Sequence, residues 1–502
     1  MNVIAVLLAG TLVTHGGGAP TASAAGGNPD YVREYIAAYR AHATIPAFAR
    51  KYDMACSRCH LTIPTLNEFG YKFRARGFRL PRTIGKEEEK PFSLGDAFSG
   101  RLQARADMQK TNQPNGAPIP NCPGGVCGSR TTTNALSFQE ATLYPLTGSW
   151  GKYFGSMTEL SVSPEDFFEV ENAYVRVVAG NDKNFFTGRV GVFHPWEGFG
   201  ASDRPYSNAR PLFQTSPISA SGRGIPFVFQ PWGLDEAGLE VGGDFDKLSL
   251  RGAVMSGTFM RWEEEANSFL PFGAQTGPWK GANQAVSALG KPYNAVAHNA
   301  PDFSANATYI LNEDGGGVSL IYYHGNVATP THCTDGTAIG QVNTGTGETC
   351  GVSAAGDVGN TDFDFTDATA FRNNFDRVAA YVSYPVGSHF LPLVGYEVGR
   401  DHTPINAVTF PATPGLQTFT SRGAFADGSF WINPHLTAGL RYDWYHPNTS
   451  RQNTQWAVTP YVNIPLNNGF QIIAEYQHRD FQLDATHNRQ NDTFQMRIIF
   501  IQ

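Results

Sequence analysis

The strongest constraint on the fold is an alternation of polar and apolar residues that recurs through most of the chain after Pro91. Between Phe98 and Met108, every second residue is apolar or small, and the residues between them are polar or charged. Similar stretches of about ten residues are separated by segments rich in Gly, Asn, Pro and Asp. Because successive side chains of a strand point to opposite faces, each stretch predicts a β-strand with one apolar and one polar face.

We expect about sixteen such strands, with fourteen or eighteen as the alternatives. They begin near residues 97, 135, 153, 168, 184, 233, 247, 302, 316, 374, 389, 422, 435, 454, 470 and 492. A soluble β-sandwich would bury the apolar faces, whereas an outer-membrane barrel turns them to lipid and keeps charges in its lumen. The barrel is favoured because connections differ in length, the long ones covering 200–230, 263–301 and 328–372. Aromatic residues also stand at strand ends, as interfacial girdles require: Tyr442, Trp444, Tyr445 and Trp456.

A cofactor motif stands ahead of these strands, at Cys56-Ser57-Arg58-Cys59-His60. This is C-x-x-C-H, the attachment signature of c-type haem. Two thiols one helical turn apart each form a thioether to the haem, and the adjacent imidazole becomes the proximal iron ligand. A redox dithiol or half a zinc site also uses C-x-x-C, but no second such pair and no βαβ pattern is present. The sequence predicts one covalent haem c.

The sixth ligand of the iron is not fixed by the sequence. Met54 lies two residues before the first cysteine of the motif, and His42 lies in the preceding segment. Met and His are the usual ligands at this place. Met54 is the first candidate, and a residue farther along the chain, or no protein ligand, are the alternatives.

The chain begins with the features of an export signal. Val3 to Val13 is an apolar run too short to span a bilayer, and Ala22-Ser23-Ala24 fits the A-x-A cleavage pattern. A signal peptide over 1–24 is therefore predicted, with a disordered tail as the alternative. Export fits the remaining cysteines, which form close pairs predicted as disulfides: Cys122 with Cys127 and Cys333 with Cys350.

Three parts follow from these observations. They are the signal peptide (1–24), a small α-helical monohaem cytochrome c domain (25–90) and an outer-membrane porin-like β-barrel (91–502). The middle part reads as a helix from Tyr31 to Ala41, a haem helix, and a basic stretch from Tyr71 to Arg79. So few residues bury little core, so this part is expected to depend on the haem and on a neighbouring structure. The basic side chains would pair with haem propionates, face an acidic wall or be solvated: Lys72, Arg74, Arg76 and Arg79.

Other charged residues are assigned to the barrel. Arginines on the polar faces are expected to line the lumen and pair with acids, or to contact the haem or a plugging segment: Arg101, Arg105, Arg176, Arg441, Arg479 and Arg497. Acidic clusters in the long loops read as solvated: Glu263 to Glu265, Asp362, Asp364 and Asp367. The formal net charge of −7, without a basic stripe, argues against nucleic acid as a partner.

The residues around the motif resemble a known family. Ile45 to Arg50, Met54 to His60, Ile63 to Gly70, and Phe73 resemble the N-terminal signature of fused outer-membrane cytochrome–porins, best known from Fe(II)-oxidising bacteria. The resemblance implies one haem c ahead of a sixteen-stranded barrel in the outer membrane of a Gram-negative-type cell. It implies electron transfer from an extracellular donor such as Fe(II) to a periplasmic c-type cytochrome or similar carrier.

Three functions are compatible with these features. The first is an electron conduit, in effect an iron(II) oxidase without bond-making chemistry, with its haem in the lumen or on the periplasmic side. The second is a diffusion porin with an accessory haem domain. The third is a soluble periplasmic cytochrome fused to a β-sandwich. The first is the main hypothesis, because one haem motif is joined to one barrel.

Overall fold

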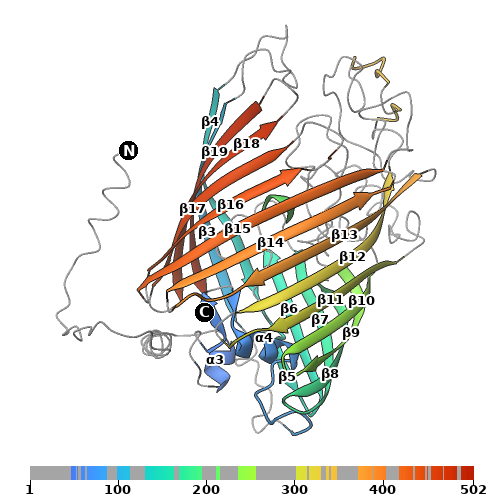
Figure 1. Cartoon of the computed structure of the whole chain (residues 1–502), viewed down its shortest axis with the longest axis vertical. Helices are drawn as coiled ribbons and strands as arrows, with labels where there is room; N and C mark the ends of the chain where they lie inside the picture. The colour runs from blue at the N-terminus through green and yellow to red at the C-terminus, as the bar shows by residue number, and fades with distance from the viewer. Residues whose placement is uncertain are drawn as a thin grey trace, which may run out of the picture.

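The alternating stretches form one closed antiparallel β-barrel (Figure 1). The structure, a computed structural model, describes residues 47–52, 54, 58–62, 65–87, 99–112, 130–162, 169–194, 211–214, 236–255, 301–313, 316–329, 335–338, 341–347, 371–387, 389–402, 418–433, 436–446, 449, 454–466, 469–482 and 488–501. The signal peptide, Cys56, His42, all four cysteines of the predicted disulfides and the acidic loop clusters lie outside these residues.

In the described residues, sixteen strands make the wall. The first eight are β3 (Gly100–Asn112), β4 (Arg130–Leu143), β6 (Phe154–Val162), β7 (Glu169–Gly180), β8 (Asn184–Phe193), β9 (Glu236–Phe245), β10 (Leu248–Met255) and β11 (Asp302–Ile310). The other eight are β12 (Gly317–Thr329), β13 (Phe371–Ser383), β14 (Phe390–Asp401), β15 (Phe419–Asn433), β16 (Leu436–His446), β17 (Gln455–Pro465), β18 (Phe470–Gln482) and β19 (Asn488–Ile501). A short β5 (Gly148–Trp150) pairs with β6, which also pairs with β4. The barrel closes where β19 pairs with β3.

The wall has the polarity expected of a barrel in lipid. Large apolar side chains face outward, such as Leu440, which is 54% exposed, and Val241, which is 61% exposed. Their neighbours in the same strands, Arg441 and Glu240, point inward and are buried. A soluble sandwich would show the reverse arrangement, so the choice of a barrel is confirmed.

The two ends of the barrel differ in their connections. At one end, which we call the short-turn end, β7 joins β8, β9 joins β10 and β11 joins β12 through six residues or fewer. The long connections, such as that between β10 and β11, lie at the opposite end. Since Arg101 of β3 faces Ile501 of β19 in the pairing, both ends of the barrel sequence lie at the short-turn end.

The predicted strands agree closely with the observed ones. Every expected strand start lies within five residues of the start in the structure. The prediction is wrong for one girdle residue, because Tyr445 points into the barrel and is buried. Trp444 faces outward, and the two-residue period of the strand therefore places Tyr445 inside. No helix among the described residues is long and apolar enough to cross a membrane.

A charge on the outer face of the wall should destabilise the barrel. We expect Leu440→Arg to lower the free energy of unfolding by about 2–4 kcal/mol in lipid vesicles, because the arginine would face hydrocarbon. Gln495→Arg is the matched lumen variant, since Gln495 donates a hydrogen bond to Asp107 at 2.9 Å and an arginine there keeps an acidic partner. Urea unfolding in vesicles measures both; equal losses would contradict the assigned faces.

Candidate functional site at the mouth of the barrel

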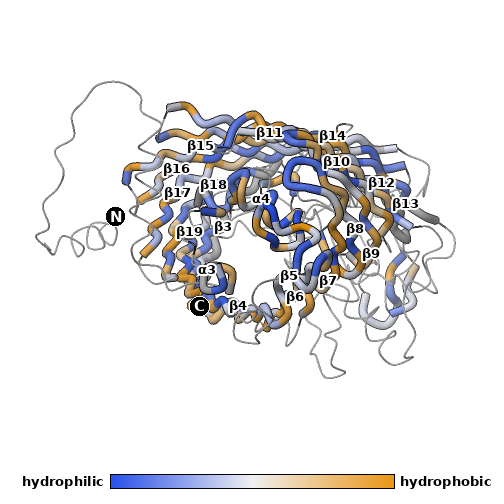
Figure 2. The backbone as a smooth tube through the Cα atoms, turned by 90° about the horizontal axis from the view of Figure 1, so that it is seen from below, coloured by the Kyte–Doolittle hydropathy of each residue, from blue (hydrophilic) through white to orange (hydrophobic). Residues whose placement is uncertain are grey.

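The segment that carries the haem motif lies at the short-turn end. It includes α3 (Ala47–Tyr52), β1 (His60–Thr62), β2 (Thr65–Leu66) and α4 (Glu68–Ala75). Seen from this end, α4 lies within the ring of strands (Figure 2). We call residues 58–62 and 65–87 the mouth segment.

The described part of the motif does not lie on an α-helix, so the predicted haem helix is wrong over these residues. Cys59 lies in a turn, and His60 begins β1, where it pairs with Leu66 of β2. This pairing extends the backbone directly after the second cysteine. The imidazole of His60 is thus carried by the start of a β-hairpin.

The start of α4 is bound to the motif. Asn67 caps the helix, because its side-chain oxygen accepts a hydrogen bond from the Gly70 N–H at 2.9 Å. The main-chain N–H of Asn67 donates to the Cys59 carbonyl at 2.9 Å, and its side-chain amide donates to the Arg58 carbonyl at 3.1 Å. Any Cβ at Gly70 would overlap the Cys59 carbonyl oxygen. The position of α4 therefore fixes the position of the second cysteine.

The end of α4 is a Schellman motif. The Phe78 N–H donates to the Phe73 carbonyl at 2.9 Å, and the Gly77 N–H donates to the Arg74 carbonyl at 3.1 Å. Gly77 has a φ of 65°, in the left-handed region that favours glycine. The rings of Phe73 and Phe78 are 5.9 Å apart, which supplies the apolar contact typical of this motif.

Aromatic rings join α3, the motif and α4. Phe48 stacks on Phe78 with centroids 4.8 Å apart, and it meets Phe73 edge to face at 5.2 Å. Phe69 stacks on Phe73 with ring centroids 6.1 Å apart. The Arg58 guanidinium lies over the Phe69 ring, 4.3 Å from its centroid. Tyr52 also meets Phe73 edge to face. These contacts give the small segment an apolar core beside the motif.

The basic side chains of α4 and the turn after it contact the barrel rather than an acidic wall. Arg79, which is fully buried, donates to three carbonyls: Trp150 at 2.9 Å, Gly151 at 2.6 Å and Phe154 at 3.0 Å. Arg76 donates to the Asp182 carbonyl at 2.8 Å. Burial lowers the pKa of the Arg76 guanidinium, while nearby acids, Asp182 first among them, raise it.

The other two basic residues have different partners. Lys72 pairs with Glu68 one turn earlier on the same helix. Arg74 approaches the Met157 sulfur at 3.9 Å, and its carbonyl accepts a hydrogen bond from Arg176 at 2.8 Å. Lumen arginine Arg176 thus contacts a plugging segment, one of the roles expected from the sequence.

A tyrosine in the middle of α4 attaches the helix to β10 and β11, on the other side from the β5–β6 turn that Arg79 contacts. The Tyr71 hydroxyl donates to the Ser249 hydroxyl of β10 at 3.1 Å, and its ring packs with Leu66 and Ile310. Burial raises the pKa of the Tyr71 phenol above its usual 10.0, although the nearby Arg251 acts to lower it. The mouth segment is therefore anchored from β5 to β11.

The closest backbone approach between the mouth segment and the wall joins two glycines. A Cβ on Gly155 of β6 would overlap the Gly77 main chain, and one on Gly77 would lie 3.3 Å from the Gly155 Cα. Beside this contact, Ala75 and Ile84 pack with Val178 and Phe185. Close packing of main chain on main chain leaves no room for a larger residue at Gly155.

Three of the remaining lumen arginines have the acidic partners expected, whereas Arg479 and Arg497 contact glutamines instead. Arg101 pairs with Glu140 at 2.6 Å and Arg441 with Asp443 at 2.8 Å. Arg105 pairs with Asp107. Arg479 donates to Gln455 at 2.6 Å, and Arg497 approaches Gln103 at 3.5 Å.

Part of a predicted outer loop lies inside the barrel. The 3₁₀ helix η2 (Leu212–Gln214) belongs to the expected 200–230 loop, yet all three of its residues are buried. The Leu212 main-chain N–H donates to the Asp443 carboxylate at 3.2 Å, and the Gln214 side-chain amide donates to the Tyr381 hydroxyl at 3.2 Å. Phe213 packs with Phe425, the ring centroids being 5.8 Å apart. The lumen is therefore filled in part from β13 to β16, across from the mouth segment.

The described motif residues fit a c-type haem in chemistry and access. Cys59 supplies a thiol and His60 an imidazole, and both are only half-buried. The aromatic core of the mouth segment lies directly beside them, through Phe69 and Arg58. Cys56, Cys59 and His60 would hold the group. Met54, half-buried two residues after α3, stays the distal candidate.

Sequence reasoning missed several residues of this site. Asn67 and Gly77 are cap signals at either end of α4, and a search for caps would have found this helix. Tyr71, Ser249 and Gly155 carry no local signal, because their contacts join segments far apart in the chain.

No protein-family model matches this chain, and no curated protein matches it either. Among solved structures, it is similar to the outer membrane channel DcaP of Acinetobacter baumannii, with 10% identity, a TM-score of 0.45, and coverage of 84% of this chain and 100% of that one. It is also similar to an anion-selective porin from Comamonas acidovorans, with 8% identity, a TM-score of 0.43, and coverage of 80% and 98%. For OprB of Pseudomonas putida the identity is 8%, the TM-score 0.41, and the coverage 81% and 95%. All three TM-scores are below 0.5, so the barrel is defined here by its own strand pairing.

Removing the Arg79 guanidinium should loosen the mouth segment. We expect Arg79→Gln to reduce the protection of the α4 amides by about 2 kcal/mol or more, because charged hydrogen bonds to buried carbonyls are lost. Arg82→Gln is the control, since Arg82 is exposed and contacts Asp182 through its main-chain N–H. Hydrogen–deuterium exchange of residues 68–75 measures both; identical exchange in the two variants would contradict the docking role of Arg79.

Alkaline pH should release α4 through Tyr71. Because the folded state raises the pKa of this phenol, its contribution is fully present below the usual 10.0 and is lost as the pH rises further. We expect α4 protection in the wild type to fall above about pH 10 more steeply than in Tyr71→Phe. Hydrogen exchange between pH 9 and 11 tests this, and parallel profiles would show that Tyr71 ionisation plays no part.

Proposed function

We propose that this chain is an outer-membrane electron conduit, in which one c-type haem at the mouth of a β-barrel passes electrons between an extracellular donor and a periplasmic carrier. Fe(II) is the proposed donor, and each ion would give up one electron and leave as Fe(III). A c-type cytochrome or similar carrier would accept the electron on the other side.

The observation that supports this most is the attachment of the described end of the motif, Arg58 to His60, to a helix that docks in the barrel mouth. Through Asn67 and Gly70, the residues next to Cys59 are held by α4, and α4 is held by the wall. A haem tethered to a mobile domain would sample many distances from a donor in the lumen. Here the docked helix would keep the cofactor at one place, which is what electron transfer through a membrane-spanning protein needs.

Each part of the site has a role in this proposal. When bound, the haem supplies one-electron oxidation and reduction. Cys56 and Cys59 would tether it, and His60 would hold the iron from one side. The aromatic rings beside the motif would exclude water from one flank, while the charged lumen would admit a cationic donor.

The second candidate is a diffusion porin. The polar, charged inner face favours it, since the inward-facing side chains of Arg101, Arg105 and Asp107 stay partly exposed, as a lining for hydrated solutes would. In that case the mouth segment would be an accessory and the lumen would conduct ions freely.

Vesicles separate the two functions. We expect the purified protein to show a covalent haem spectrum and to let external Fe(II) reduce an oxidised c-type cytochrome enclosed in vesicles. Cys59→Ala should lose the covalent haem, and its rate should fall to that of protein-free vesicles. The control Arg82→Gln, at an exposed residue outside the motif, should keep both.

Bilayer conductance of the same samples completes the test. A conduit with a docked mouth segment should give low conductance in the wild type and in Cys59→Ala alike. Large, porin-like conductance combined with equal reduction rates in both proteins would establish the diffusion porin and refute the conduit. Absence of any covalent haem would refute it as well.

A further inference from the structure

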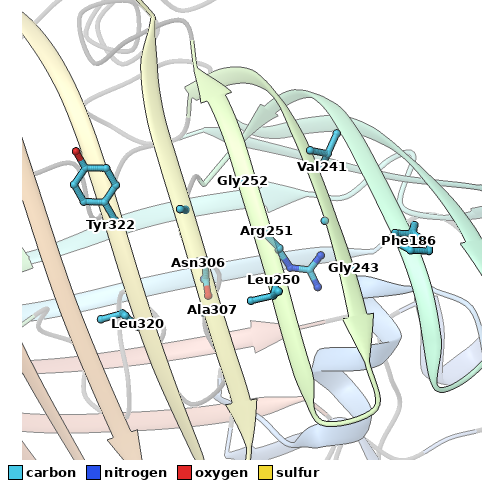
Figure 3. Close-up of a pocket in the computed structure, with 12 residues that line it drawn as sticks. Phe186, Val241, Gly243, Leu250, Arg251, Gly252, Asn306, Ala307, Leu320 and Tyr322 are labelled. Atoms are coloured by element: carbon cyan, nitrogen blue, oxygen red, sulfur yellow. The ribbon is translucent and has the colours of Figure 1, made fainter.

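A groove of about 550 Å³ lies on the outward face of the barrel, across β8 to β12 (Figure 3). Its rims are large apolar side chains that project outward, among them Phe186, Val241 and Tyr322. Its size falls within the range of about 300–1,000 Å³ that small-molecule sites occupy. The groove opens toward the membrane rather than into the lumen.

Small residues form the floor of this groove. Strand pairing aligns Gly252 of β10 with Ala305 of β11, and Ala305 with Tyr322 of β12. In the adjacent row, Gly243 and Ala307 flank Leu250. Packing of the wall does not require a glycine at position 252. A Cβ built there would lie 3.9 Å from one carbonyl oxygen and otherwise meet open space. The hollow at this position is therefore not required by the packing of the barrel wall.

A polar cluster borders the groove on the side of the long loops. The Tyr322 hydroxyl donates to Asp376 at 2.7 Å. His324 is bonded to the same carboxylate at 2.9 Å, and His402 approaches it at 3.4 Å. Arg400 faces Asp376 in the strand pairing and is exposed. Three groups that can carry positive charge thus surround one carboxylate on an otherwise apolar face.

A second cluster elsewhere on the barrel has the same pattern without the groove. Tyr476 and His478 of β18 both bond Asp492 of β19 at 2.7 Å. The strand partner of Tyr476, however, is Phe494, and its next neighbour is Met108, which is 50% exposed. Polar clusters of this kind suit the membrane interface. The first cluster, in contrast, has a hollow paved with glycine and alanine next to it.

We propose that the groove and the cluster together bind one phosphate-bearing lipid of the leaflet at the long-loop end. The acyl chain lies along the floor of Gly252 and Ala305, and the phosphate meets His324, His402 and Arg400. A strongly apolar hollow fits hydrocarbon, and the guanidinium and imidazole N–H donors at its polar edge fit an anionic head group. The proposal rests on the barrel spanning a membrane, and it is independent of the haem.

Native mass spectrometry of delipidated protein tests the proposal. Phosphatidic acid and a diacylglycerol with the same chains serve as probes. We expect the full chain to retain one phosphatidic acid and no diacylglycerol. Gly252→Phe, which fills the groove, should lose this bound lipid. Ala104→Phe should keep it, because Ala104 of β3 is exposed on the outward face and lies outside the groove strands β8 to β12.

Head-group variants test the polar half. His324→Ala combined with Arg400→Ala should lose the preference for phosphatidic acid, whereas His478→Ala should keep it. Heat-modifiable gel migration confirms that each barrel is folded. Equal binding by Gly252→Phe and Ala104→Phe, or equal retention of the two lipids by the wild type, would overturn the proposal. So would a loss of dimers rather than of lipid in Gly252→Phe, since a second copy would then occupy the groove.

Discussion

The structure depends on the closure of the sheet between β19 and β3. A lipid bilayer offers no hydrogen-bond partner to an exposed sheet edge, so a strand-based membrane protein must pair its first strand with its last. Here twelve residue pairs join the two strands, from Gln490 with Asn112 to Ile501 with Arg101. Closure also separates an apolar outer face from a polar inner one. The inner face then provides the carbonyls and hydroxyls on which the mouth segment docks.

Docking of the mouth segment couples the cofactor motif to the barrel. The Schellman turn at Gly77 directs the chain so that Arg79 reaches the carbonyls of the β5–β6 turn. The cap at Asn67 does the same for Cys59 at the other end of α4. One short helix, α4, therefore fixes the position of the motif relative to the wall. The loss of either end would remove the hydrogen bonds that hold Cys59 to α4 or the end of α4 to the wall.

The architecture could be read from the sequence because a barrel repeats one simple rule. Alternation with a period of two predicts the strands, and it places Arg441 and Arg497 in the lumen, where both are buried. The same rule placed Tyr445 inside, and only the expectation of a girdle set it outside. The C-x-x-C-H motif was equally local, since its five residues are adjacent.

The docking of the site could not be read in this way. Tyr71 meets Ser249 across 178 residues, and Phe213 reaches Phe425 through a long loop. Nothing in the local sequence of either pair predicts its partner. The basic residues illustrate the limit well: their charge suggested acids or propionates, whereas Arg76 and Arg79 bind main-chain carbonyls, which every sequence contains.

The placement of the haem at the short-turn end is the central claim, and a distance measurement tests it most directly. Spin labels attached at Lys183→Cys and at Thr449→Cys mark the short-turn end and the long-loop end. Paramagnetic relaxation by the haem iron in the membrane-embedded protein reports which label is nearer. Strong relaxation of the label at 183 and weak relaxation at 449 is the predicted result. The reverse pattern, or equal and weak effects at both labels, would contradict a haem held at this mouth.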